Sequence, residues 1–153
     1  MIAVEWPDGS RWTLRHLCLD LNGTLALDGA LLPGVAGALL DLAQDLELHL
    51  LTAGTHGGLP AVEQALGVRA VPIGLGAEKE AYVAQLGAET CVAIGNGRND
   101  AAMLRRARLG VAVLGPEGLA AETAQAADVV VGDILTGLAL LRHPLRLTAT
   151  LRP

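Results

Sequence analysis

The sequence contains few aromatic residues, one lysine and two cysteines. Its 153 residues include two Trp, one Tyr and no Phe, although 52% of all residues are hydrophobic. The core must therefore consist mainly of Leu, Val, Ile and Ala. Cys18 and Cys91 each lie within an apolar run, where a free cysteine behaves as a small core residue. Two isolated thiols of this kind indicate a reducing compartment. We therefore expect a cytoplasmic protein without a disulfide framework.

Excess positive charge and long apolar runs are also lacking. The formal net charge is −5, so we expect no basic surface of the kind that binds nucleic acid. No segment reaches the ~18 uninterrupted apolar residues of a membrane helix, and the N-terminus does not resemble a signal peptide. Neither a nucleic acid nor a membrane is expected as a partner.

Short apolar runs alternate with helical patterns, which predicts a three-layer α/β fold of Rossmann-like type around a parallel sheet. Strands are expected at residues 17–21, 48–51, 68–73, 91–94, 110–114 and 128–131. Helices are expected at residues 33–46, 59–66, 77–86, 100–107, 117–126 and 134–141.

The two ends of the chain lie outside this alternation. The Pro7-Asp-Gly-Ser10 turn between two short apolar segments predicts an N-terminal β-hairpin. We assign residues 1–14 to this hairpin, 15–141 to the core and 142–153 to a tail, all within one domain of residues 1–153. The pattern of the tail fits a strand or a helical turn equally well.

The segment His16-Leu-Cys-Leu-Asp-Leu-Asn-Gly-Thr24 carries the clearest functional signal. An apolar run that ends in Asp20 is typical of a central parallel strand with a carboxylate at its C-terminal edge, where open α/β sheets bind ligands. Gly23 permits a sharp turn whose bare N–H groups can hold an anion. A carboxylate beside such a turn suggests a nucleophile that faces a phosphoryl group, with a divalent cation between them.

Three further segments follow in a fixed order. A second apolar strand ends in Thr52, Lys79 begins a helical segment, and a third apolar strand leads into Gly95-Asn-Gly-Arg-Asn-Asp100. Together they offer a hydroxyl, a cation and an acidic turn, which supply the positioning and charge neutralisation that phosphoryl transfer requires.

The lysine is informative because Arg outnumbers Lys ten to one in this chain. An ammonium is a compact point charge that a planar guanidinium does not replace freely. Retention of the one Lys at residue 79 therefore favours a specific role on phosphate.

These residues resemble the motifs of the haloacid dehalogenase superfamily of phosphohydrolases, in particular its small members that are similar to the phosphorylation domain of P-type ATPases. The resemblance runs from about residue 14 to 141. It implies that Asp20 is the nucleophile and a Mg²⁺ ligand. It implies catalytic roles for Asp20, Asn22, Thr52 and Lys79. Phosphate contacts are implied for Gly23, Thr24, Thr52, Ala53, Lys79 and Asn99, and metal ligation for Asp20, Asn22, Asn96 and Asp100.

Two positions depart from the superfamily pattern. Asn22 stands where many of the phosphatases carry the Asp that acts as general acid and base, a contribution worth about 10²- to 10⁴-fold. Asn96 stands where a metal-binding Asp is usual. We therefore expect slow hydrolysis of an aspartyl-phosphate and weakened Mg²⁺ affinity. The alternative is a degenerate fold of the same type that serves as a binding or regulatory module.

The loops are too short for a cap domain. Only 27 residues separate Thr24 from Thr52, and 26 separate Thr52 from Lys79, and the expected helices and strands occupy most of them. The same loops leave no room for a nucleotide-binding domain, and the sequence contains no membrane span, so we exclude an ATP-driven pump. An open site can accept a phosphorylated metabolite or a phosphoprotein. It can also be covered by a second copy of the chain, in a homo-oligomer formed through the hairpin.

Two other ligand-binding folds are disfavoured. Gly74-x-Gly76 and Gly95-x-Gly97 do not complete the G-x-G-x-x-G pattern of nicotinamide-binding domains. A phosphoacceptor receiver domain would carry its acceptor Asp on the third strand, whereas Asp20 lies at the end of the first core strand.

Overall fold

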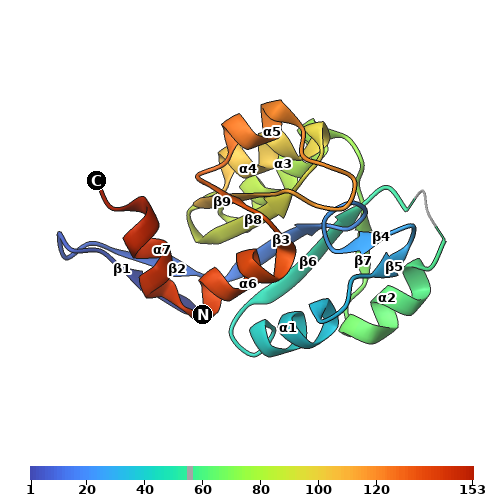
Figure 1. Ribbon diagram of the computed structural model, residues 1–153, viewed down its shortest axis with the longest axis horizontal. Helices are drawn as coiled ribbons and strands as arrows, with labels where there is room; N and C mark the ends of the chain where they lie inside the picture. The colour runs from blue at the N-terminus through green and yellow to red at the C-terminus, as the bar shows by residue number, and fades with distance from the viewer. Residues whose placement is uncertain (55–56) are drawn as a thin grey trace.

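A six-stranded parallel sheet forms the centre of the molecule in the computed structural model, which describes residues 1–54 and 57–153 (Figure 1). The strands follow the order β10-β9-β8-β3-β6-β7, and every neighbouring pair is parallel. Their bounds are β3 His16–Asp20, β6 Glu47–Thr52, β7 Ala70–Pro72, β8 Cys91–Gly95, β9 Leu109–Val113 and β10 Val129–Val131. The predicted α/β fold is confirmed.

Helices cover both faces of the sheet. One layer contains α1 (Val35–Leu42), α2 (Leu59–Leu66) and α6 (Ile134–Arg142), and the other contains α3 (Gly76–Leu86), α4 (Ala101–Arg106) and α5 (Ala121–Ala126), as Figure 1 shows. Successive residues of a strand point to opposite faces. Leu17 and Leu19 of β3 accordingly belong to one apolar cluster and Cys18 to the other.

The chain ends pack against each other. Strands β1 (Ile2–Glu5) and β2 (Arg11–Leu14) form the predicted antiparallel hairpin. The tail, which the sequence left open, forms helix α7 (Pro144–Leu151) and lies along β1 (Figure 1). The Thr148 hydroxyl donates to the Glu5 carbonyl at 3.1 Å, and Leu147 is fully buried.

Two predicted helices are shorter than the sequence suggested. The helix expected at 33–46 begins only at Val35, because Gly34 has a left-handed backbone with φ of +81°, and it ends at Leu42. The helix expected at 117–126 begins at Ala121, because Gly118 has φ of +86° and its N–H donates to the Gly115 carbonyl. Left-handed glycines interrupt an α-helix.

A small hairpin after Asp20 was not predicted. Strands β4 (Ala26–Leu27) and β5 (Ala30–Leu31) pair through a turn at Asp28 and Gly29, both with positive φ. This hairpin, α1 and their short connections fill the chain between β3 and β6, and no cap domain occurs among the described residues. None of the helices in residues 1–54 and 57–153 is both long and apolar enough to cross a bilayer.

Replacement of Leu147 by Ala should destabilise the protein by about 2–5 kcal/mol, because it leaves a cavity between α7 and the hairpin. Leu145 on the same helix is 82% exposed, so Leu145→Ala is the matched control and should change stability by less than about 0.5 kcal/mol. Urea unfolding of both variants measures the difference. Equal effects of the two substitutions would show that α7 does not pack as described.

Candidate functional site

Three of the predicted site residues lie where neighbouring central strands end. Asp20 is the last residue of β3, Thr52 is the last of β6, and Asn96 directly follows β8. The chain runs outward from β3 through β6 and β7, then crosses back to β8, so the strand order reverses between β3 and β8. Crevices at such reversals are the usual ligand sites of open α/β sheets.

Lys79 joins two carboxylates at this edge. Its side chain extends from the first turns of α3 and is only 1% exposed. The Nζ atom donates to Asp20 Oδ1 at 2.9 Å and to Asp100 Oδ1 at 2.7 Å. Because a buried ammonium is costly without partners, these two contacts account for its position.

Asp100 also organises the Gly-rich turn after β8. Its Oδ2 accepts the backbone N–H of Asn96 at 3.1 Å and of Gly97 at 2.9 Å. A Cβ at Gly95 would lie 2.5 Å from Asp100 Oδ2, so the turn closes only around glycine. Asp100 itself is fully buried, and its carboxylate is occupied on both oxygens.

Thr24 links Asp20 to Asn96. The Thr24 hydroxyl lies 3.1 Å from Asp20 Oδ2 and 2.9 Å from Asn96 Oδ1, and it is fully buried. Gly23 has φ of +79°, and a Cβ there would lie 2.6 Å from Asn96 Nδ2. The Asn-Gly-Thr turn is therefore packed directly on the turn after β8.

A cavity of about 180 Å³ opens above Asp20, and we call it the Asp20 cavity. It is lined by Asp20, Asn22, Thr52, Ala53, Lys79, Asn96, Gly97, Asn99 and Glu117. Gly23, Thr24 and Asp100 lie behind this lining. The Asn22 Oδ1 atom is buried and has no hydrogen-bond partner within the described part of the chain, so it is an acceptor available to a ligand.

Thr52 and Asn99, two further residues of the lining, each make one local hydrogen bond. The Thr52 hydroxyl accepts the Gly54 N–H at 3.2 Å, while the Asn99 amide donates to the Gly74 carbonyl at 2.9 Å. Asn99 thus connects the turn after β8 to the loop before α3, the helix that carries Lys79.

Glu117 is a lining residue that the sequence analysis missed. A Cβ at Gly23 would lie 2.6 Å from Glu117 Oε2, so this carboxylate stands over the Asn-Gly-Thr turn. Its loop is held by the Asn96 amide, which donates to the Gly118 carbonyl at 3.1 Å, and by the Ala120 N–H, which donates to the Asn96 carbonyl at 2.9 Å. The Gly115-Pro-Glu-Gly118 run was the signal for a loop rather than a helix.

Burial and neighbouring charges together set the ionisation of Asp20 and Lys79. Burial and the nearby Asp100 carboxylate raise the pKa of Asp20 to about 6, against the opposing effect of Lys79. Burial disfavours the charged form of Lys79, but the carboxylates of Asp20 and Asp100 outweigh it and raise the pKa of Lys79. Lys79 is therefore a permanent positive charge, and the charge on Asp20 depends on what binds beside it.

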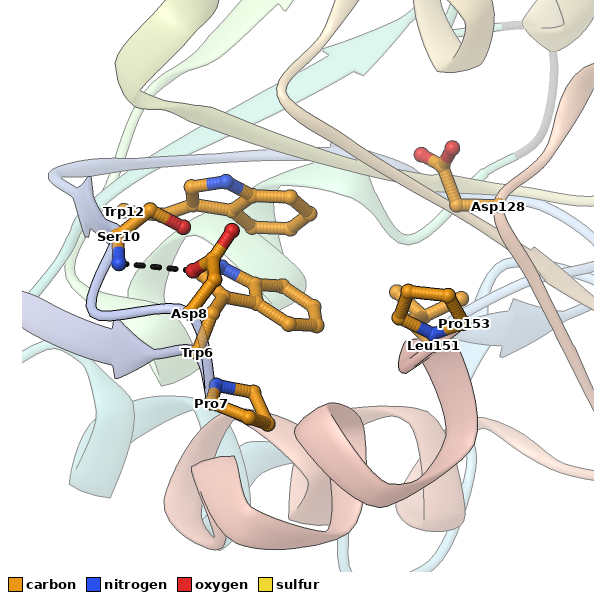
Figure 2. A pocket seen from close by; sticks show the side chains of 8 residues that line it. All are labelled: Trp6, Pro7, Asp8, Ser10, Trp12, Asp128, Leu151 and Pro153. Carbon is orange, nitrogen blue, oxygen red and sulfur yellow. Dashed lines mark hydrogen bonds between the residues drawn. The ribbon is translucent and has the colours of Figure 1, made fainter.

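A separate cavity of about 450 Å³ lies at the N-terminal hairpin. Figure 2 shows it between the Trp6 and Trp12 rings and the C-terminal end of α7. The two rings lie 4.5 Å apart between centroids, and Arg108 stacks on Trp12 at 4.3 Å. This cavity contains none of the residues predicted to act on phosphate.

Similar proteins were found mainly among solved structures. No protein-family model matches the chain. An uncharacterized protein of Methanocaldococcus jannaschii is 48% identical over 61 residues, which are 40% of this chain and 66% of that protein. The match thus leaves about a third of the archaeal protein outside the aligned segment.

The structural neighbours share the fold. The cobalt-bound deoxy-D-mannose-octulosonate 8-phosphate phosphatase of Haemophilus influenzae aligns with a TM-score of 0.70 and 17% identity, over 92% of this chain and 94% of that one. The corresponding Moraxella catarrhalis phosphatase, in complex with magnesium and phosphate ions, gives 0.68 and 19%, over 89% and 90%. The catalytic domain of a CPx-ATPase gives 0.62 and 23%, over 74% and 46%. The chain therefore shares its fold with these proteins and with a putative HAD family hydrolase from Streptomyces avermitilis, which aligns with a TM-score of 0.65 and 18% identity over 84% of this chain and 90% of that one.

The Asp20→Asn substitution should remove a pH-dependent part of the stability of the metal-free protein. The folded-state pKa of Asp20 is about 6 and the ordinary value is 3.8, so the folded protein holds this proton more tightly than the unfolded chain does. The contribution of Asp20 to the free energy of unfolding is present below about pH 4 and is lost as the pH rises through about 6.

Urea unfolding with a chelator, between about pH 4 and about pH 7, should therefore show the wild type losing stability relative to Asp20→Asn as the pH rises. A difference between the two proteins that does not vary with pH would contradict the raised pKa.

Proposed function

We propose that the protein is a metal-dependent phosphatase that forms an aspartyl-phosphate on Asp20. The observation that carries this proposal is the buried Lys79 ammonium, which bridges Asp20 and Asp100 at the C-terminal edge of β3. A carboxylate nucleophile, a fixed cation and a hydroxyl around one small cavity are the parts that phosphoryl transfer requires.

In the first step an Asp20 carboxylate oxygen attacks the phosphorus atom of a phosphate monoester. The bond from phosphorus to the ester oxygen breaks, and the alcohol leaves with a proton supplied by solvent. Lys79 holds positive charge against the transferred group, and the Thr52 hydroxyl can donate to one of its oxygens. Thr24 orients the nucleophile through the hydrogen bond to Asp20 Oδ2.

The donor atoms around the Asp20 cavity suit Mg²⁺. The Asp20 carboxylate, the amides of Asn22 and Asn96, and the Glu117 carboxylate all line it, and oxygen atoms are the ligands that Mg²⁺ prefers. The unpartnered Asn22 Oδ1 is consistent with a cation bound nearby. A bound Mg²⁺ would neutralise phosphate charge. We assign ligation to Asp20 with residues 22 and 96, while Asp100 acts behind them by holding Lys79 and the turn after β8.

In the second step a water molecule attacks the phosphorus atom and releases phosphate and free Asp20. The water must lose a proton, and the Asn22 amide cannot accept it. Glu117 is the other carboxylate in the cavity lining, so it is the available base. Because residue 22 supplies no acid or base, hydrolysis of the intermediate is expected to be slower than in enzymes that carry an acid at that position.

The substrate we propose is a phosphorylated small molecule. An adjoining pocket of about 480 Å³ shares Asn96, Gly97 and Glu117 with the Asp20 cavity, which leaves room for the rest of a metabolite. The structural neighbours named for octulosonate 8-phosphate support this class. A phosphoprotein, or a site closed by a second copy, remains compatible with the absence of a cap in the described residues.

The Asp20→Asn variant should lose at least about 10³-fold in Mg²⁺-dependent hydrolysis of an aryl phosphate, because no covalent intermediate can form. Asp28→Asn is the matched control, since Asp28 is exposed and its positive φ suits Asn. Release of the aryl alcohol measures turnover. Binding of phosphate or BeF₃⁻ to the wild type without turnover would contradict the phosphatase and support a degenerate fold that acts as a binding module.

The Asn22→Asp variant should hydrolyse the same ester faster, by up to about 10²-fold, because it restores a proton relay beside the nucleophile. The wild type should release a burst of aryl alcohol and then continue at a slow steady rate. In the variant the steady rate should approach the rate of the burst, so that no separate burst is seen. An unchanged rate in a folded variant would show that proton transfer at residue 22 is not limiting and that Glu117 already serves as the base.

A further inference from the structure

A second cluster of metal-binding side chains lies at the opposite edge of the sheet. His16 is the first residue of β3, Glu47 is the first of β6, and His49 follows two residues later. His16 pairs with Glu47 and Cys18 with His49 in the parallel register, so all three side chains share one face. We call this group the distal cluster. Along β3, His16 lies four positions before Asp20, about 13 Å away.

The ligand atoms are already close to a coordination geometry. His16 Nδ1 lies 3.1 Å from His49 Nε2 and 3.5 Å from Glu47 Oε2, and His49 Nε2 lies 3.9 Å from Glu47 Oε1. Tetrahedral Zn²⁺ with ligands at about 2.0–2.2 Å places its ligand atoms about 3.3–3.6 Å apart. Small side-chain shifts therefore suffice to place one ion among the three.

Tyr82 contacts the second ring nitrogen of His49. Its hydroxyl lies 3.0 Å from His49 Nδ1, and with Nδ1–H donating to that oxygen the Nε2 lone pair faces His16 and Glu47. Partners of this kind on the far nitrogen are the usual support of metal-bound histidines.

We propose that His16, Glu47 and His49 form a site for a first-row transition ion such as Zn²⁺, distinct from the oxygen-lined Asp20 cavity. The two imidazoles favour Zn²⁺ over Mg²⁺. His49 is buried and His16 nearly so, whereas the Glu47 side chain is 68% exposed, so an ion can enter from solvent and water can complete its coordination.

The distal cluster connects the same elements that form the candidate active site. His16 lies on β3 with Asp20, His49 lies on β6 with Thr52, and Tyr82 lies on α3 with Lys79. An ion here would cross-link β3 to β6 and fix α3 through Tyr82. The expected effect is stabilisation of the folded protein by the metal. This inference does not depend on the proposed phosphatase activity.

Titration of the wild type with Zn²⁺, in the presence of a large excess of Mg²⁺ to occupy the Asp20 cavity, should show one tight equivalent by calorimetry and a raised melting temperature. His16→Gln and His49→Gln should each weaken binding by more than about 100-fold, which exceeds the effect of losing an outer partner. Glu47→Gln, at an exposed position that should not affect folding, should weaken it by at least about tenfold, and so should Tyr82→Phe.

His143→Gln is the matched control, because His143 is exposed on another element, and it should bind Zn²⁺ as the wild type does. Co²⁺ provides an optical readout: visible d–d bands of a low-coordinate ion should appear in the wild type and be absent in His49→Gln. Circular dichroism without metal checks that each variant folds. Absence of Zn²⁺ binding to the folded wild type, or wild-type affinity in His16→Gln or His49→Gln, would overturn the proposal.

Discussion

The contact of one buried ammonium with two carboxylates is the constraint on which the rest of the site depends. Lys79 is 1% exposed and reaches both Asp20 and Asp100, so three elements must meet within hydrogen-bond distance of a single atom. A charge buried this deeply is tolerated only when it is paired. The end of β3, the turn after β8 and the start of α3 are therefore fixed relative to one another before any ligand arrives.

Asp100 extends this constraint into the backbone. One of its oxygens binds Lys79 and the other accepts two backbone N–H groups of the turn after β8. This turn also positions the Asn96 amide, which contacts Thr24 and the loop that carries Glu117. The position of Glu117 over the cavity is thus a remote consequence of the Lys79 charge, transmitted through one carboxylate and one turn.

Much of this arrangement could be predicted from the sequence, because strand ends are local signals and parallel strands end at one edge. Asp20, Thr52 and Lys79 each follow an apolar run or open a helix, and the lone Lys stood out by composition. Glu117 could not be found in this way, since its place depends on Asn96, twenty-one positions earlier in the chain. The tail was undecidable for a similar reason: Leu147 is buried only because the hairpin offers a surface to α7. The distal cluster depends on the register of β3 with β6, which no single segment specifies.

The negative charge around Lys79 explains why residues 22 and 96 are both asparagine. Asp20 and Asp100 already share one Lys79, and burial together with their mutual repulsion raises the pKa of Asp20. Two more carboxylates at residues 22 and 96 would add negative charge to the same small volume and would resist ionisation of Asp20 further. Neutral amides at both positions keep oxygen donors in the lining without that repulsion. The same choice withholds a proton acceptor from the second step, so the proposed slow hydrolysis and the electrostatic balance around Lys79 follow from one feature of the chain.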